Sequence, residues 1–502
     1  MGRQTITFIF PTLLFLTIII SSPTQINSIK STESNTSASN GFISFGISQL
    51  GLEFAKDLMI NTALSSLIPL QLPEIEQKIQ IPLVGKVSMV LSDIVISQVN
   101  VSHSVVRPGE IGVVIVASGA TAVLRFDWSY EYSTWLFEVT DSGVASVKVE
   151  GMEIGMTLGL YSQQGTLRLS PVDCGCYVDY ISIKLDGGAS WLYQGIVDFF
   201  EDDIISAIED TITNKVTEAV KKLDSKFQSF SKEITFGDVA TLNVTITDGP
   251  IISSDSVVIG IDGLFTQIDS EVTSGSYGKK LLSTSSCNSA ENMVAISVHE
   301  NVLNSASVVY FNTHNMYWIV DNLPDQKLMN TAGWRFIIPK LYKQFPNDEM
   351  NLNFTVLSPP IIKVENEGIV ATVNTDVVIN VMDAADVIPV ACISMEIEAS
   401  GFAGISLNTI AGGISLSKLT MSLKWSKIGN LHMILVQSVM STLIKSIIIP
   451  VVNLRLRIGY TLPDFYGYGL QNASIVYDDA KIIVCSDIAH HAYEYIPHQI
   501  LS

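Results

Sequence analysis

Histidine and cysteine are the residues of this chain best suited to metal binding or catalysis, and their spacing limits the chemistry open to them. The chain has 7 histidines and 5 cysteines in 502 residues. The close pairs are Cys174 and Cys176, in the segment DCGC, and the adjacent His490 and His491. A zinc site needs further ligands at suitable spacing, and the sequence offers no second pair beside either one. The sequence therefore predicts no metal and no cofactor. Structural thiols, or one disulfide to a distant partner, are the interpretations left for the DCGC cysteines.

The sequence lacks the motifs of the common enzyme classes. The chain has no Gly-x-Ser-x-Gly nucleophile elbow, no His-Glu-x-x-His zinc motif, no phosphate-binding loop and no dinucleotide fingerprint. A nucleophile, its base and an orienting group cannot be assembled from the residue pattern. We therefore expect a protein that is not an enzyme.

The composition excludes some classes of partner. The formal net charge is −20, whereas nucleic acids and anionic membranes attract clustered lysine and arginine. We therefore expect no nucleic-acid partner. Hydrophobic residues make up 47% of the chain and charged residues only 16%, so the surplus apolar surface must face a large core or an apolar ligand. The composition does not fix the oligomeric state.

Residues 1–28 have the pattern of a cleaved secretory signal. One arginine precedes an apolar run from Ile6 to Ile20, which is shorter than the ~20 residues of a membrane span, and small polar residues follow. A retained signal anchor is the alternative. Five N-glycosylation sequons are spread along the chain, at Asn35, Asn100, Asn243, Asn353 and Asn472. We expect a secreted, extracellular glycoprotein.

The segment GGASWLYQGIVDFFEDDIISAI, residues 187–208, predicts a long amphipathic helix. Apolar residues recur at every fourth position, and the same step continues to Leu223. The helix would have up to about 35 residues and a length of roughly 50 Å. Its apolar face either packs against protein or encloses an apolar ligand.

Strands with one apolar face surround this helix in the first half of the chain. Residues 87–101 and 147–160 alternate apolar with small or polar side chains, as in an antiparallel sheet that needs a cover on one side. A first helix is predicted over residues 47–66, where Pro69 stops the pattern.

The second half repeats this order. A helix is predicted from Ile296, mainly strands over residues 330–428, and a long amphipathic helix over residues 431–451. Polar residues interrupt this last helix, so we interpret it as amphipathic and not as a membrane span. The strand-rich stretch 235–267 would join two similar halves.

Several segments resemble the bactericidal/permeability-increasing and lipopolysaccharide-binding protein family. GGASWLYQGIVDFFEDDIISAIEDTITNKV resembles the helix that crosses the first barrel of that family, and DCGCYVDYISIKLDGGASWLYQG is similar to its plant branch. SQLGLEFAKDLM, IIPKLYKQFPN and IIPVVNLRLRIGYTLP agree in order along the chain. The resemblance covers about residues 41–490.

This resemblance implies an α+β fold, a boomerang of two elongated barrels, each a twisted antiparallel sheet packed with long helices, joined by a central sheet. It implies a first lipid-binding barrel over residues 41–234, a central sheet or linker over 235–267 and a second barrel over 268–495. Barrels of the family take phospholipid acyl chains in apolar pockets. The residues expected to contact lipid, on the apolar face of the long helix, are Leu192, Ile196, Phe200 and Ile204.

The sequence departs from the family at two places. Mammalian members join a cysteine before the long helix to one within it, and the second position here is Thr217. Bactericidal members place lysines at the tip of the first barrel, whereas the matching segment here is RFDWSYEYSTWLFEV, with one arginine and three acidic residues. Its aromatic residues either pack within the sheet or enter a membrane interface; they are Trp128, Tyr130, Tyr132 and Trp135.

Three functions are consistent with these features. The first, implied by the resemblance, is binding of bacterial lipopolysaccharide in antibacterial defence and innate immunity. The second is carriage of phospholipid without lipopolysaccharide specificity, for which apolar pockets suffice. The third, an enzyme acting on lipids, is disfavoured by the missing catalytic motifs. The expected partners are lipopolysaccharide or phospholipid, with a membrane surface as a further candidate.

Overall fold

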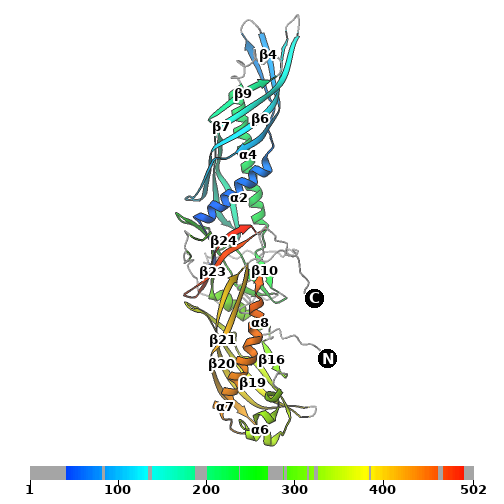
Figure 1. Cartoon of the computed structure of the whole chain (residues 1–502), viewed down its shortest axis with the longest axis vertical. Coiled ribbons are helices and arrows are strands. Elements are labelled where there is room, and N and C mark those ends of the chain that lie inside the picture. The colour runs from blue at the N-terminus through cyan, green and yellow to red at the C-terminus, as the bar shows by residue number, and fades with distance from the viewer. Residues whose placement is uncertain are drawn as a thin grey trace, which may run out of the picture.

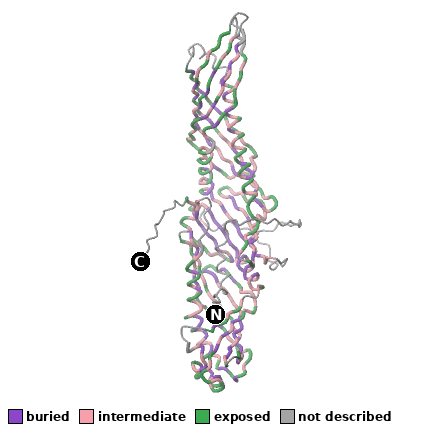
Figure 2. Tube along the Cα trace, turned by 90° about the vertical axis from the view of Figure 1, so that its right-hand side faces the viewer, coloured by how far each residue is buried: buried purple, intermediate pink, exposed green. Residues whose placement is uncertain are grey.

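The chain folds into an elongated molecule of three parts stacked along one axis (Figures 1 and 2). This computed structural model describes residues 41–490 except 82–84, 134–137, 187–199, 237, 269–286, 288–290, 314–315, 322–325, 384–385, 407 and 462–466. A first barrel lies at one end, a second barrel at the other, and a six-stranded sheet lies between them (Figure 1). The predicted boomerang of two antiparallel barrels with a central sheet is confirmed.

The first barrel is an eight-stranded antiparallel sheet curled around one long helix. Its main path is β2-β4-β6-β7-β8, with β3, β5 and β9 paired beside it. Alternating apolar side chains face the interior, as the period of two in the sequence predicts. The strands are β2 (Leu70–Gln71), β3 (Ile75–Ile81), β4 (Gly85–Asn100), β5 (His103–Pro108), β6 (Gly112–Ser133), β7 (Glu138–Gln163), β8 (Thr166–Tyr177) and β9 (Tyr180–Asp186).

Two helices accompany this sheet. Helix α2 (Gln49–Leu67) closely matches the predicted helix over residues 47–66, and Ser48 caps it by accepting a hydrogen bond from the Gly51 amide at 3.3 Å. Helix α4 (Glu201–Gln228) is the described part of the long helix. Its acidic first turn and the lysine in its last turn match the direction of the helix dipole.

The central sheet combines strands from the predicted joining stretch, residues 235–267, with strands from both ends of the described chain. Its order is β12-β13-β1-β15-β24-β23, so the first and last strands of the chain lie in one sheet. A small three-stranded sheet, β10-β11-β14, lies beside it. The strands are β1 (Ile43–Ser48), β10 (Glu233–Phe236), β11 (Ala240–Asn243), β12 (Ile251–Ile252), β13 (Ser256–Ile261), β14 (Phe265–Gln267), β15 (Val294–His299), β23 (Tyr468–Asp478) and β24 (Lys481–His490).

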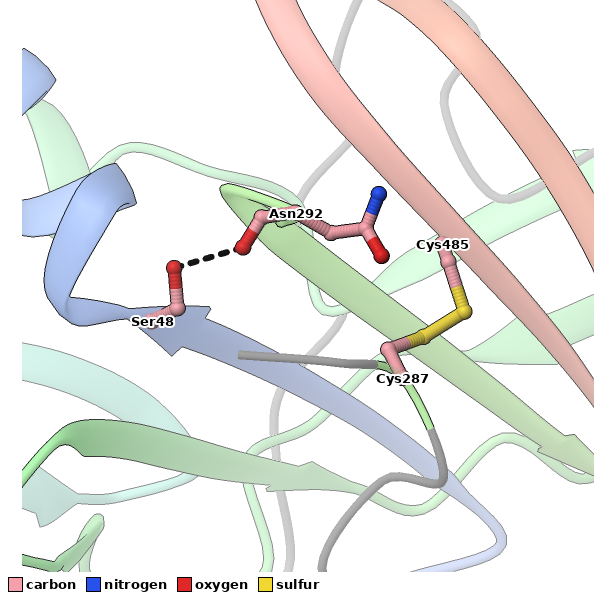
Figure 3. The surroundings of a disulfide bond; sticks show 4 residues. All are labelled: Ser48, Cys287, Asn292 and Cys485. Atoms are coloured by element: carbon pink, nitrogen blue, oxygen red, sulfur yellow. Dashed lines mark hydrogen bonds between the residues drawn. A yellow bond between two sulfur atoms is a disulfide. The ribbon is translucent and has the colours of Figure 1, made fainter. Parts of the chain in front are cut away.

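One disulfide fastens this central sheet. Cys287, which precedes β15, is bonded to Cys485 on β24 (Figure 3). Nearby, the Ser48 hydroxyl donates to the Asn292 carbonyl at 2.6 Å, so the start of α2 is held to the segment between Cys287 and β15 (Figure 3). Cys174, Cys176 and Cys392 are free thiols.

The predicted helix from Ile296 is wrong for its first four residues. Residues 294–299 form β15, and helix α5 (Glu300–Asn312) begins only after His299, whose Nδ1 accepts from the Asn301 amide at 3.1 Å. All six residues of β15 are buried, including polar Ser297 and His299. A short buried strand that runs directly into a helix cannot be told from the first turn of that helix by its periodicity alone.

The second barrel is a seven-stranded sheet packed with a long C-terminal helix (Figure 1). Strands were predicted from residue 330, but strand structure over this region begins only at Glu349 because short helices precede it. These helices are η3 (Gln326–Met329), η4 (Thr331–Trp334) and α6 (Pro339–Gln344). The strands are β16 (Tyr317–Val320), β17 (Glu349–Val356), β18 (Ile361–Glu365), β19 (Gly368–Asp383), β20 (Asp386–Ser406), β21 (Thr409–Ser426) and β22 (Tyr460–Thr461).

The C-terminal helix is longer than the predicted 431–451. It runs through α7 (Met433–Leu443), a π-helical turn (Ile444–Ile448) and α8 (Ile449–Ile458). Val436, Met440 and Leu443 are buried in the core of the second barrel, which confirms that one face of this helix packs on the sheet.

Candidate functional site

The apolar face of α4 packs on the first sheet from Phe200 onward. Phe200 and Ile204 are each 1% exposed and belong to one core cluster with residues of β4, β6, β7 and β9. The structure therefore assigns these two predicted lipid contacts to the protein core. Leu192 and Ile196, the other two, lie outside the described residues.

A cavity of about 350 Å³ lies elsewhere in the first barrel, between the C-terminal half of α2 and strands β4 and β6. Its volume is within the range of about 300–1,000 Å³ that small-molecule sites occupy. Aliphatic side chains from the helix and both strands face it, together with a few polar groups. The lining residues are Leu64, Ile68, Gln98, Val99, Asn100, Thr121, Ala122 and Val123.

Helix α2, one wall of this cavity, is apolar but poorly covered by protein. Of the residues with a described burial state between Gln49 and Leu67, only Gly51, Leu52 and Lys56 are buried. Leu50 and Leu58 are exposed, and several apolar neighbours are half-buried. Apolar residues occur on every side of the helix, a signal already present in SQLGLEFAKDLMINTALSSL that the sequence reasoning used only to predict a helix.

Lys56 fixes α2 to the sheet through a buried ammonium group that has three oxygen partners. Its Nζ lies 2.7 Å from Glu53, 3.1 Å from Asp57 and 3.2 Å from the Ser104 carbonyl oxygen, to which it donates. Burial alone would lower the pKa of the Lys56 ammonium, but its bonds to the two carboxylates outweigh burial and raise that pKa. Lys56 is therefore charged at neutral pH and anchors the helix rather than serving as a base.

Each barrel is closed along one sheet edge by helix side chains instead of a further strand. In the first barrel, the Val178 amide donates to Glu209 at 2.8 Å, the Leu169 amide donates to Asp224 at 2.9 Å, and Gln228 donates to the Leu167 carbonyl at 2.7 Å. All three helix residues lie on α4, opposite β8 or the residue that follows it. They satisfy edge groups that would otherwise be unpaired.

The second barrel repeats this arrangement on β21. Gln437 of α7 donates to the Leu419 carbonyl at 2.8 Å. Asn453 of α8 donates to the Ile414 carbonyl at 2.9 Å and accepts from the Ile414 amide at 2.7 Å. The two halves, which share no visible residue repeat, thus close their sheets in the same way.

The aromatic residues predicted for the tip differ in burial. Trp128 is 1% exposed and its Nε1 donates to the Val144 carbonyl at 3.2 Å, so this ring packs within the sheet and the alternative of membrane contact is wrong for it. Room for the ring comes from Gly143, where a Cβ would lie 2.8 Å from it. Tyr130 and Tyr132 are half-buried, and Trp135 lies outside the described residues.

The charge at this end of the first barrel is acidic. Arg125 is exposed on β6, but exposed acidic residues outnumber it on the same hairpin. These are Asp127, Glu131 and Glu138, and half-buried Asp141 adds a further negative charge. The described part of the hairpin therefore offers little positive charge to a phosphate.

Cys174 and Cys176 face α4 from β8. The Cys174 thiol lies 4.0 Å from the Thr213 carbonyl and is hydrogen-bonded to the side chain of Thr217. Burial raises the pKa of both thiols, that of Cys176 to about 12, with Glu209 adding to the effect there. Both are protonated at neutral pH, which makes them poor nucleophiles.

The described part of the chain contains no group of three or more His, Cys, Asp or Glu side chains that could hold a metal ion. Of the sequons, Asn100 and Asn472 are exposed, Asn243 and Asn353 are half-buried, and Asn35 lies outside the described residues.

One described helix, Met433–Ile458, is long and apolar enough to cross a membrane by length and composition. Only 22% of its most apolar 18-residue window is buried. Core helices of soluble proteins pass the same test, but they are mostly buried, and this one is not.

Comparison with known proteins identifies relatives over nearly the whole chain. The N-terminal domain of the LBP/BPI/CETP family matches residues 51–224 and the C-terminal domain matches residues 279–489. A BPI/LBP family protein of Arabidopsis thaliana is 48% identical over 91% of this chain and 94% of its own length. A bactericidal permeability-increasing protein of Sebastes schlegelii is 25% identical over 87% of this chain and 93% of its own.

A solved structure supports the same fold. The crystal structure of a lipopolysaccharide binding protein aligns with 90% of this chain and 99% of its own, with a TM-score of 0.59 at 17% sequence identity.

Proposed function

The chain belongs to the LBP/BPI/CETP family and has its lipid-binding fold, and from this premise we propose that it is a secreted protein that binds bacterial lipopolysaccharide and phospholipid acyl chains in antibacterial defence. Relatives that match most of this chain are named as lipopolysaccharide-binding and bactericidal permeability-increasing proteins. Secretion is supported by the signal-like residues 1–28 and by the exposed sequons at Asn100 and Asn472.

The observation that carries lipid binding is the cavity beneath α2. Leu64 and Ile68 from the helix and Val99 and Val123 from the sheet line it. A helix with apolar residues on all sides is stable in water only if something apolar covers them. Here protein covers few of them, and an acyl chain between α2 and the sheet would complete the burial.

Phospholipid carriage without lipopolysaccharide specificity is the second candidate, and the acidic tip favours it. Recognition of lipid phosphates usually employs arginine or lysine, whereas the hairpin that carries Arg125 also exposes Asp127, Glu131 and Glu138. A carrier of zwitterionic phospholipid needs apolar pockets and no cluster of positive charge.

We also propose that the chain is not an enzyme. The buried thiols Cys174 and Cys176 have raised pKa values, and the Nδ1 of His299 is engaged as the cap of α5. Neither arrangement activates a nucleophile. Lipid hydrolysis abolished by a single serine or histidine substitution would contradict this.

The decisive experiment is mass spectrometry of lipids extracted from the mature protein after secretion from eukaryotic cells. We expect phospholipid in stoichiometric amounts, and less of it in Leu64→Asp than in wild type. Ala55→Asp, at an exposed position of the same helix outside the pocket lining, is the matched control. A folded protein that carries no lipid would contradict the proposal.

A competition assay then separates the two candidates. Lipopolysaccharide that displaces the bound phospholipid would support the first, whereas exchange of phospholipid alone would support the second. Binding of lipopolysaccharide through phosphates should weaken between low and physiological salt, while acyl-chain binding should not.

A further inference from the structure

Helix α8 exposes an apolar stripe on the side that faces away from its sheet. Val452 and Leu456 are buried against the second barrel. Leu454 and Ile458, on the opposite side of the helix at about 100° per residue, are 67% and 73% exposed. Val451, 39% exposed, continues the same line. We call these three residues, Val451, Leu454 and Ile458, the outer stripe.

The stripe is one continuous surface because its residues repeat at steps of three and four along the helix. Core packing does not explain it, since Val452, Leu456 and Asn453 already attach the other side of α8 to the sheet. A row of exposed aliphatic side chains on a folded protein marks a contact surface.

Positive charge flanks the stripe on both sides. Arg455 and Arg457 are exposed, and helical geometry places them on opposite sides of Leu454. In a chain with a net charge of −20, two arginines beside an aliphatic row form a distinct local environment. Helices that lie in a membrane interface have this design, with apolar residues entering the acyl boundary and long basic side chains reaching the headgroups.

We propose that the outer stripe of α8 docks on the surface of a phospholipid membrane, with Arg455 and Arg457 pairing with lipid phosphates. The proposal deepens the lipid-binding function and rests on it, because it names the face on which the protein meets the bilayer that supplies or receives its lipid. The outer face of α7 begins with Ile434, 85% exposed, but it continues with the exposed polar residues Ser438, Thr442 and Ser446 into the π-helical turn. Contact is therefore centred on α8.

A second copy of the chain fits this face less well. A two-fold contact through the same stripe would bring the arginines of both copies together, and like charges at a desolvated contact are unfavourable. Three side chains also fall short of the roughly 1,200–2,000 Å² of a stable interface. The phosphates of a bilayer attract both arginines and set no such area requirement.

The net charge of the chain determines the choice of vesicle for the test. A charge of −20 repels a strongly anionic membrane, although salt screens that repulsion beyond about 8 Å at physiological ionic strength. Phosphatidylcholine carries a phosphate without net charge. Phosphatidylcholine vesicles are therefore the probe, and the full mature chain is the protein.

The experiment measures co-flotation of the protein with these vesicles. The double variant Leu454→Asp/Ile458→Asp should bind about tenfold more weakly or worse, because two aliphatic anchors become charged. Arg455→Gln/Arg457→Gln should lose severalfold. Val172→Asp, at a 52% exposed valine of β8 in the first barrel, is the matched control and should bind as wild type does.

Two further readouts keep the outcomes distinct. Thermal melting should be unchanged in the stripe variants, since the substituted side chains are exposed, and lipid extracted from them should equal that of wild type. Equal vesicle binding by wild type and the stripe variant, or no binding by wild type, would overturn the proposal. A wild-type dimer that the variant dissociates, seen by light scattering, would assign the stripe to a second copy. Vesicle binding with no extractable lipid would leave the docking face standing and remove the cargo function.

Discussion

Cys174 and Thr217 lie against each other where β8 meets α4. The resemblance placed Thr217 at the position where mammalian relatives carry the second cysteine of a disulfide, and the structure puts its side chain in hydrogen-bonding contact with the Cys174 thiol. The helix therefore lies on the sheet in the register that a disulfide between positions 174 and 217 requires, although this chain has no disulfide there.

Thr217→Cys should restore that cross-link. Because the two side chains are already in contact, an oxidised sample should contain a disulfide between Cys174 and the introduced cysteine, and unfolding should cost about 2–4 kcal/mol more. Peptide mapping under non-reducing conditions detects the bond. In Ser225→Cys, on the exposed side of the same helix, the introduced thiol should remain open to alkylation. Full alkylation of both variants would show that α4 does not sit in this register.

The sequence predicts on which face of its element a residue lies, but not what covers that face, as three residues illustrate: Trp128, Phe200 and Leu64. Alternation along RFDWSYEYS assigns Trp128 to one face of its strand, but it does not say that this face is covered. Burial of Trp128 depends on Gly143 and on the Val144 carbonyl, both on the neighbouring strand. The four-residue step identified the helix face of Phe200 correctly, whereas the cavity beside Leu64 depends on how α2 lies on the sheet.

Between whole elements, the contact of α4 with the edge of β8 depends on a few buried polar groups. Asp224, 9% exposed, accepts from the Leu169 amide at 2.9 Å and lies 3.3 Å from the Arg168 guanidinium. Asp224→Ala would leave a buried amide and a partly buried cation without their acceptor. We expect a loss of about 1–3 kcal/mol in the free energy of unfolding.

Urea denaturation of Asp224→Ala measures this loss. Glu218→Ala is the control, since Glu218 pairs with Lys215 and Lys222 on the exposed side of α4. Exposed ion pairs contribute little, so the control should unfold at the wild-type midpoint. Equal midpoints for all three proteins would mean that the edge contact does not stabilise the barrel.

Three strands of the second barrel meet at a carboxylate that titrates. Asp376 of β19 accepts from Ser394 of β20 and Lys424 of β21, each at 2.6 Å. Burial alone would raise the pKa of Asp376, but these two bonds outweigh it and lower that pKa. A folded pKa below the unfolded value stabilises the protein above an ordinary aspartate pKa of about 3.9. This stability disappears as the pH falls through the lowered folded pKa.

Asp376→Asn should remove this part of the pH dependence. The variant is expected to be less stable than wild type at pH 7, and the difference should shrink as the pH falls below about 4. Chemical denaturation across that range measures it. Asp383→Asn, an exposed change of the same charge on the same strand, should differ little from wild type at any pH. A constant difference for Asp376→Asn would contradict the lowered pKa.

Long, regular helices and strands were predictable from the sequence, whereas short helices and a strand buried on both faces were not. The period of two located β4 and β7, and helical spacing located α2 and the C-terminal helix. Strand β15 was predicted as helix because both of its faces are buried, and the short helices before Glu349 carry too few residues to show a period.

At the scale of the whole molecule, the central sheet makes the two barrels one structure. β1, from the start of the described chain, pairs with both β13 and β15, and β15 pairs with β24 from its end. No local pattern could predict this, since pairing of strands far apart in the sequence is a property of the folded chain. The matched order of helices and strands in the two halves did predict a strand-rich connection between them.

Cys287–Cys485 lies at the centre of this arrangement and closes a loop of 198 residues in sequence separation. A long loop of that kind restricts the unfolded chain strongly, so Cys287→Ser/Cys485→Ser should reduce stability by about 2–5 kcal/mol. The bond joins the segment before β15 to β24 of the central sheet and not the two barrels directly. Its loss should therefore loosen the central sheet first, while the barrel strands keep their protection.

Hydrogen exchange on the double serine variant tests that order. Amides of β1, β15 and β24 should exchange faster than in wild type, and those in the paired regions of β6 and β7 should not, because their ladder from Gly112 to Ser133 is independent of the bond. Cys392→Ser, at a buried thiol of the second barrel, controls for the loss of a cysteine as such and should leave β1 and β24 protected. Uniformly faster exchange in both barrels would show instead that the molecule unfolds as a single unit, with the disulfide stabilising all of it equally.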